Sequence, residues 1–253
     1  MKIAASQLTC VPADVPANVR ILARLAAQAR DEGAELVVFP EFALTGYELG
    51  ALAGDPGLWV HDPEGDPRLD PVRGAGIATV VNCAVATGGE RPAIGTLVFG
   101  ADGRLLTTYR KQHLHGQEQD VFTAGDRDGR FALGGLRFAL ATCYDNHFAE
   151  LTSRGSADGC RVHLASSLYG TGDGVRERAT VHPRIAADSG MYVALANHVG
   201  PAGPWTGCGR AAVWAPDGTL LAEADDRTAS VVTAEVPAEV PAEVPATGTP
   251  PNG

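Results

Sequence analysis

The stretch Phe138-Ala-Leu-Ala-Thr-Cys-Tyr-Asp-Asn-His-Phe-Ala-Glu150 joins two kinds of local structure. Its first five residues form an apolar run ending in Thr142, which is typical of a buried strand. The polar residues that follow Cys143 can open a helix. A cysteine at such a junction faces a cleft and lies near backbone N–H groups that favour a thiolate. We therefore interpret Cys143 as a candidate nucleophile, although a cysteine at a strand end is more often a packing residue.

Two further reactive side chains also follow apolar strands. Glu41 comes directly after Leu36-Val-Val-Phe-Pro40, and Lys111 comes two residues after a second apolar segment, 105–109. A lone lysine is ordinarily a solvated surface residue, and a lone glutamate after a strand is as often a capping carboxylate. Together with the cysteine, however, they place three reactive groups at three strand ends.

Three motifs in this order resemble the nitrilase or carbon-nitrogen hydrolase superfamily. They are Phe39-Pro-Glu41, Tyr109-Arg-Lys-Gln-His-Leu114 and Cys143-Tyr-Asp-Asn-His-Phe-Ala-Glu150. The resemblance starts at the N-terminus and extends to Thr233. It implies an α/β fold, a four-layer α-β-β-α sandwich in which two sheets face each other and helices cover the outside. It also implies that subunits pack together, so we expect a homodimer or a higher homo-oligomer.

The resemblance implies a role for each of the three groups. Cys143 would be the nucleophile. Glu41 would be the general base that accepts the thiol proton, passes it to the departing amine and later activates water. Lys111 would stabilise the tetrahedral oxyanion together with the backbone N–H of Tyr144. A thiolate forms if a base takes the proton or if a cation lowers the thiol pKa, and the sequence leaves both routes open.

Other residues are expected to complete the site. Glu118 matches a second glutamate of the family and would orient Lys111, with Asp120 as a competing candidate. Tyr47 follows the first motif and would help to shape the substrate site. His147 either lines the pocket or caps the following helix.

Several positions depart from the family pattern. His115, Ala124 and Ala149 stand where many relatives carry a phenylalanine and two prolines. Asn146 and His147 stand where many relatives carry an apolar residue and an arginine. No reactive atom is lost through these changes. They affect the lining of the pocket, and therefore the choice of substrate rather than the chemistry.

The resemblance predicts a cofactor-independent hydrolase that cleaves the C–N bond of a small linear amide or carbamoyl compound through a cysteine thioester. One alternative is a nitrilase, which uses the same residues on a C≡N bond. Another is an inactive binding or scaffold protein, although such relatives normally lose one of the three groups retained here. A carboxylate-bearing substrate would need a cationic contact, and three arginines are candidates by sequence position: Arg176, Arg178 and Arg184.

Composition limits the other classes of function. The chain has 253 residues, 45% of them hydrophobic, and a formal net charge of −10, which argues against nucleic acid and anionic membranes as partners. No apolar stretch approaches the roughly 20 residues that cross a membrane. Five scattered cysteines indicate reduced thiols and a cytoplasmic location. His113 and His115 lack a clear third ligand, so we expect no metal.

The pattern of apolar residues and turns predicts the remaining elements. Strands are expected at 2–8, 35–39, 77–84, 94–99, 105–109, 137–142, 161–165, 191–197, 211–215 and 219–222. Helices are expected between 14 and 33, at 148–154 and at 175–188, with Pro183 kinking or ending the last one. Residues 1–233 are interpreted as the hydrolase domain. The Pro/Ala/Glu-rich segment 234–253 is expected to be extended or disordered, or to lie across a partner subunit.

Overall fold

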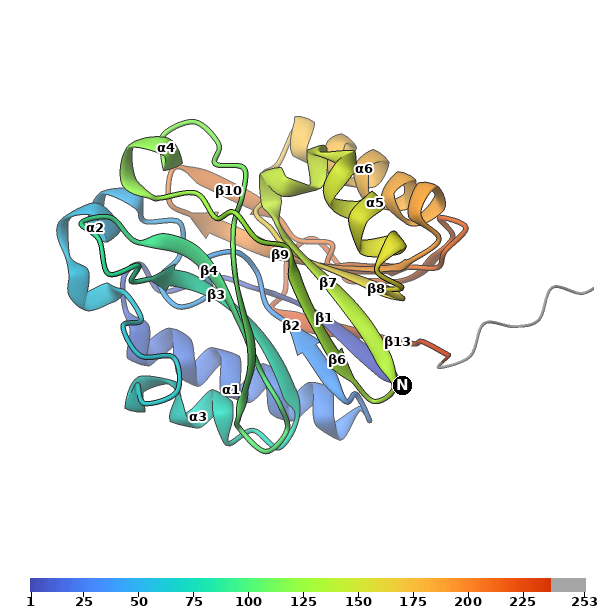
Figure 1. The fold of residues 1–253 in the computed structure, drawn as a ribbon, viewed down its shortest axis with the longest axis horizontal. Helices are drawn as coiled ribbons and strands as arrows, with labels where there is room; N and C mark the ends of the chain where they lie inside the picture. Colours follow the sequence, from blue (N-terminus) through green and yellow to red (C-terminus); the bar gives the residue numbers. More distant parts are fainter. Residues whose placement is uncertain (238–253) are drawn as a thin grey trace, which may run out of the picture.

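A computed structural model describes residues 1–237, in which two layers of strands face each other and helices cover both outer sides (Figure 1). The strands in these residues are β1 (Lys2–Leu8), β2 (Leu36–Val38), β3 (Ala78–Val85), β4 (Ala93–Phe99), β5 (Leu105–Arg110), β6 (Gly129–Leu133), β7 (Leu136–Thr142), β8 (Val162–Ser166), β9 (Tyr192–Ala202), β10 (Trp205–Cys208), β11 (Ala212–Trp214), β12 (Leu220–Glu223) and β13 (Ser230–Glu235). The helices are α1 (Val15–Asp31), α2 (Leu49–Gly54), α3 (Asp70–Arg73), α4 (Glu118–Val121), α5 (Ala149–Ala157) and α6 (Asp173–Ser189), with short 3-10 turns η1 (Pro56–Leu58), η2 (Pro67–Leu69) and η3 (Cys143–His147).

The strands follow the order β5-β4-β3-β2-β1-β9-β8-β7-β6. Strands β1, β2 and β3 are mutually parallel, as are β7, β8 and β9, whereas β4, β5 and β6 pair in antiparallel fashion. The two halves meet where β1 pairs with β9 over two residues, Gln7 with Asn197 and Leu8 with His198. Because parallel strands end at one edge of a sheet, the segments that follow β2 and β7 meet at the same end of the molecule.

Successive side chains of a central strand point to opposite faces of its sheet, and this alternation explains how the sheets and helices form layers. Ile3 of β1 and Phe138 of β7 belong to the core between the two sheets. Ala4 of β1 points the other way and packs with Leu22 of α1. On the opposite half, Leu195 of β9 faces α6, in a separate outer cluster. A strand that buries both faces in this way must be apolar throughout, and the result is the predicted four-layer α-β-β-α sandwich.

The outer helices are placed on opposite sides of the sandwich. Figure 1 shows α1 and α3 below one sheet and α5 and α6 above the other. The first helix begins as the sequence predicts, since the Asp14 side chain accepts a hydrogen bond from the N–H of Ala17.

The structure confirms the helix expected at 175–188 and differs from the sequence-based assignment in several strands. Pro183 does not end α6, which continues to Ser189 because its buried face has anchors on both sides of the proline, His182 and Ile185. Strands β6, β10 and β13 were not predicted. Strand β13 pairs antiparallel with β1 as far as Glu235, so ordered pairing passes the expected boundary at residue 233. The expected tail beyond residue 237 lies outside the described residues.

None of the helices in the described residues is long and apolar enough to cross a membrane.

Candidate active site

Three charged side chains form a buried cluster at the strand ends. Glu41 follows β2, Lys111 follows β5, and Glu118 begins α4. The Lys111 ammonium donates to Oε1 of Glu41 at 2.8 Å and to the two oxygens of Glu118 at 2.9 and 2.8 Å. The exposed fractions of the three residues are 0%, 0% and 1%. An ammonium between two carboxylates in so dry a place is held rigidly, because any movement would leave an unpaired buried charge.

Cys143 stands at the start of η3, directly after β7. Its backbone has φ of 46°, in the left-handed region that residues with a side chain rarely adopt. Phe42, next to Glu41, has φ of 49°. Strained backbone of this kind persists only where the surrounding structure enforces it, and here it occurs at two of the three segments that carry the predicted reactive groups.

The Cys143 thiol faces a cavity, and Sγ lies 3.8 Å from the carbonyl oxygen of Leu168. Burial raises the pKa of the thiol well above its ordinary value, and Glu41 raises it further, whereas Lys111 lowers it. The net effect is therefore opposite to the expectation that the strand–helix junction favours a thiolate. Of the two routes that the sequence left open, proton removal by a base is the one that fits this environment.

Glu41 has the properties of that base. Burial raises its pKa from 4.5 to about 7, against the lowering effect of the Lys111 charge. Its Oε2 is buried and has no hydrogen-bond partner among the described residues. One carboxylate oxygen is thus occupied by Lys111, and the other is available for a proton.

Lys111 remains charged despite its burial. Desolvation alone would lower the pKa of the ammonium, but Glu41, Cys143 and Glu118 together raise it above its ordinary value. A permanent cation beside the thiol can stabilise negative charge that develops on a bound substrate. The N–H of Tyr144 is a second donor at this place, since the second residue of a short helix such as η3 has no helical acceptor.

A buried amide connects the segments that carry Glu41 and Cys143. Asn82 of β3 accepts a hydrogen bond from the N–H of Phe42 at 2.8 Å. It donates to the hydroxyls of Thr96 at 2.9 Å and Thr142 at 3.2 Å. The last contact spans the two sheets, so Asn82 ties the strained residue after Glu41 to the residue before Cys143. Its place in an apolar strand had given no signal of this role.

Asp145 holds η3 against the segment of Lys111. Its Oδ2 accepts hydrogen bonds from the Tyr109 hydroxyl at 2.6 Å and from the N–H of Thr142 at 3.0 Å. Its Oδ1 accepts the N–H of His113 at 2.9 Å. The conformation of the cysteine turn is therefore coupled to the strand end that presents Lys111.

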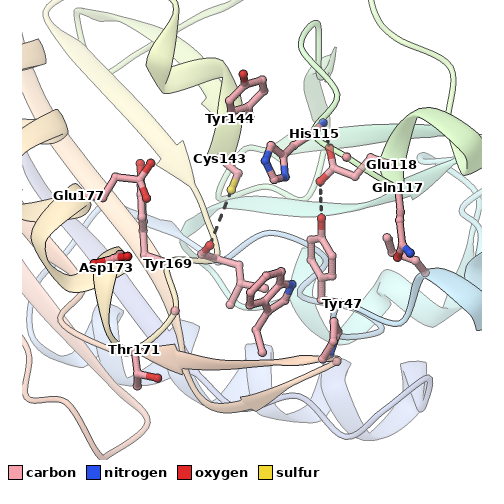
Figure 2. A pocket seen from close by; sticks show the side chains of 18 of the residues that line it. Tyr47, His115, Gln117, Glu118, Cys143, Tyr144, Tyr169, Thr171, Asp173 and Glu177 are labelled. Atoms are coloured by element: carbon pink, nitrogen blue, oxygen red, sulfur yellow. Dashed lines mark hydrogen bonds between the residues drawn. The ribbon is translucent and has the colours of Figure 1, made fainter.

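The cavity in front of the thiol has a volume of about 800 Å³ and is lined by four predicted residues besides Cys143: Tyr47, Glu118, Tyr144 and His147. Figure 2 shows Tyr47 and Glu118 on one side of the thiol, where the Tyr47 hydroxyl donates to Glu118 at 2.7 Å. His147 lies 2.9 Å from a carboxylate oxygen of Glu177. Asp120, the competitor of Glu118, is exposed and does not contact Lys111.

The arginines that were candidates for binding a substrate carboxylate lie outside the cavity. None of the three arginines proposed for a carboxylate lines the cavity. Arg178 is buried and bonds Glu223 at 2.5 Å, while Arg176 and Arg184 pair on the outer face of α6 with Asp173 and Asp188. Within residues 1–237, no group of three or more His, Cys, Asp or Glu side chains is arranged to hold a metal ion.

Comparison with known proteins agrees with this geometry. The family model for carbon-nitrogen hydrolases matches residues 2–246. The chain belongs to the carbon-nitrogen hydrolase family. A hydrolase from Pseudomonas protegens, described by its position in the pqqF 5′ region, is 31% identical over 88% of this chain and 79% of its own length. An (R)-stereoselective amidase from a Pseudomonas species is 31% identical over 79% of this chain and 72% of its own.

A solved member of the nitrilase superfamily, the amidase from Nesterenkonia sp. AN1, superimposes with a TM-score of 0.85 at 28% identity, covering 94% of each chain. In one of its structures, acrylamide has added to the active-site cysteine. In another, a cysteine-to-alanine variant is in complex with butyramide. This chain therefore shares its architecture with an amidase that has a cysteine in its active site.

Proposed function

We propose that this protein is an amidase that hydrolyses small linear amides through a thioester at Cys143. The observation that carries the proposal is the buried Glu41–Lys111–Glu118 cluster, which lies beside the Cys143 thiol that faces a cavity. A base, a fixed cation and a nucleophile are the groups that acyl transfer requires.

In the first half-reaction, Glu41 accepts the thiol proton as Sγ attacks the amide carbon, and the C–S bond forms. The carbonyl oxygen becomes an oxyanion that receives hydrogen bonds from the Lys111 ammonium and the Tyr144 N–H. When this intermediate collapses, the C–N bond breaks and Glu41 returns the proton to the nitrogen. Ammonia or an amine leaves, and the acyl group stays on Cys143.

In the second half-reaction, Glu41 takes a proton from water, whose oxygen attacks the thioester carbon. The same two donors stabilise the second oxyanion. The C–S bond then breaks, the acid product leaves, and the sulfur takes back the proton held by Glu41. Glu118 stays bonded to Lys111 throughout and positions the ammonium. Each half-reaction thus uses Glu41 once as a proton acceptor and once as a proton donor. A carboxyl group with a pKa close to neutrality suits both roles.

The test is mass spectrometry of the intact protein together with an ammonia-release assay over a panel of amides and nitriles. We expect an acyl adduct and ammonia with the wild type, and neither with Cys143→Ala. Cys160→Ala is the matched control, because Cys160 is a buried free thiol that does not line the cavity. An adduct that persists in Cys143→Ala, or no adduct and no ammonia from the wild type with any compound, would refute the proposal.

A further inference from the structure

The cavity that contains Cys143 has an unbalanced charge. Among the described residues that line it, four are carboxylates and none is a lysine or arginine: Glu48, Glu118, Asp173 and Glu177. The nearest cation, Lys111, lies behind this surface and is fully buried. It is already matched by Glu41 and Glu118. Arg176, which does not line the cavity, pairs with Asp173. A substrate entering the cavity therefore meets mainly acidic groups.

Two of the four carboxylates have partners that occupy them. Both oxygens of Glu118 accept hydrogen bonds, Oε1 from Lys111 and the Tyr47 hydroxyl and Oε2 from Lys111 and the N–H of His115. Asp173 is 90% exposed at the outer rim and pairs with Arg176. Glu118 is therefore fully engaged, and the charge of Asp173 is matched by an arginine. Glu48 and Glu177 remain, one at the start of α2 and the other on α6.

Glu177 has the surroundings of a cation site. It is 45% exposed, and its Oε1 lies 2.9 Å from Nε2 of His147. This contact engages one of the two carboxylate oxygens. The second carboxylate oxygen has no ion-pair partner in the described part of the chain. Figure 2 shows Glu177 with Tyr169 and Asp173 across the thiol from Glu118.

An unpartnered hydroxyl lies on the same wall. Tyr169 lines the cavity and is only 4% exposed, yet its hydroxyl has no hydrogen-bond partner within residues 1–237. A buried hydroxyl without a partner is costly, and a ligand that supplies an N–H removes the cost. The rings of Tyr144 and Trp205 also line the cavity. Aromatic rings beside a carboxylate are a typical environment for ammonium and guanidinium groups.

We propose that the cavity selects amides that carry a positively charged group at the end remote from the carbonyl. Glu177 is the main contact for that charge, and Glu48 is a second carboxylate that attracts it. The inference rests on the proposed amidase function and names its substrate class. It also reverses the expectation of an arginine that binds a substrate carboxylate, because the cavity lining would repel such a substrate.

The first experiment compares substrates of one shape and different charge. Valeramide, γ-aminobutyramide and glutaramate differ only in a terminal methyl, ammonium or carboxylate, and longer and shorter ω-amino amides test the reach of the subsite. We expect kcat/KM for the best ω-amino amide to exceed that of its neutral counterpart by about tenfold, with the difference mainly in KM and reduced by salt.

The second experiment assigns the effect to Glu177. Glu177→Gln should lower the ratio of kcat/KM between the ω-amino amide and the neutral amide by about tenfold, towards unity. Glu150→Gln makes the same charge change on the exposed surface of α5, outside the cavity, and should keep the wild-type ratio. A ratio that is equally high in Glu177→Gln would overturn the assignment of this residue.

The outcomes separate the inference from the function on which it rests. If the wild type hydrolyses neutral amides as well as every ω-amino amide, or prefers glutaramate, the cationic substrate class is wrong and the amidase function stands. If no amide yields ammonia or an acyl adduct, both are wrong. Hydrolysis with a salt-sensitive preference for the ammonium, lost in Glu177→Gln, would support both.

Discussion

Carboxylates occur both in the buried cluster behind the cavity and at the cavity mouth, in opposite surroundings. In the buried cluster, which is the inner end of the site, Glu41 and Lys111 are fully buried and bond each other at 2.8 Å. At the mouth, the side chain of Glu177 is 45% exposed, and Trp205 is 55% exposed. Coulomb interactions are several times stronger where water is excluded. Charges at the inner end therefore change one another's protonation and reactivity, whereas charges at the mouth bias which molecules bind.

Removing the cation at the inner end should have the largest effect. In Lys111→Ala, substrate still enters the cavity, but the oxyanion loses a fixed donor, and we expect kcat to fall by about 10²–10³-fold. The variant should also lose about 3–5 kcal/mol of stability, because two buried carboxylates lose their partner. Steady-state kinetics with a neutral amide and thermal denaturation measure the two effects.

Arg184→Ala is the matched control for this prediction. Its side chain is 78% exposed on α6 and pairs with Asp188. We expect changes within about 0.5 kcal/mol in stability and no change in turnover, because exposed ion pairs contribute little. Near-normal turnover by Lys111→Ala would show that the buried cation is not needed for catalysis, and that the inner end of the site does not differ from the mouth in the way described.

The pH dependence should report the pKa of Glu41. Since this group must be ionised to accept the thiol proton, protonation as the pH falls removes the base. With the pKa raised by burial from 4.5 to about 7, kcat/KM for a neutral amide should decline about tenfold per pH unit below about 7. Because Lys111 lowers this pKa, residual activity of Lys111→Ala should show the decline at higher pH. A decline that begins only near 4.5 would contradict the assignment of Glu41 as the base.

The smallest effect is expected from the contact that joins the two sheets. Asn82→Ala leaves the N–H of Phe42 without its acceptor in a fully buried place, at a cost of about 1–3 kcal/mol. Asp173→Asn, at the cavity mouth, should change stability by no more than about 0.5 kcal/mol. Urea denaturation of both variants checks the difference. Equal midpoints would mean that Asn82 is not part of the framework that holds Glu41 and Cys143 together.

Much of the fold was predictable because it depends on local patterns. The short run of residues that forms β1 and the Asp14 cap of α1 were recognised from short stretches of sequence. Strand β13 was missed because the repeating Ala-Glu-Val-Pro begins within it, and its pairing partner β1 lies at the other end of the chain. The continuation of α6 through Pro183 depends on buried contacts on both sides of the proline. Distant partners of this kind leave no local signal.

The sequence by itself determined the chemistry offered by this protein. Cys143, Glu41 and Lys111 were singled out by their places at strand ends and by three motifs that resemble the carbon-nitrogen hydrolase family, because reactive groups need rigid supports that have recognisable local patterns. The tertiary structure alone decided how those groups act. It buried Glu41 and raised the pKa of the thiol, and it placed Glu177 from α6 on the cavity wall while it turned Arg176 and Arg184 outward. Burial and charge balance arise from segments far apart in the chain, and they exist only once those segments are packed together.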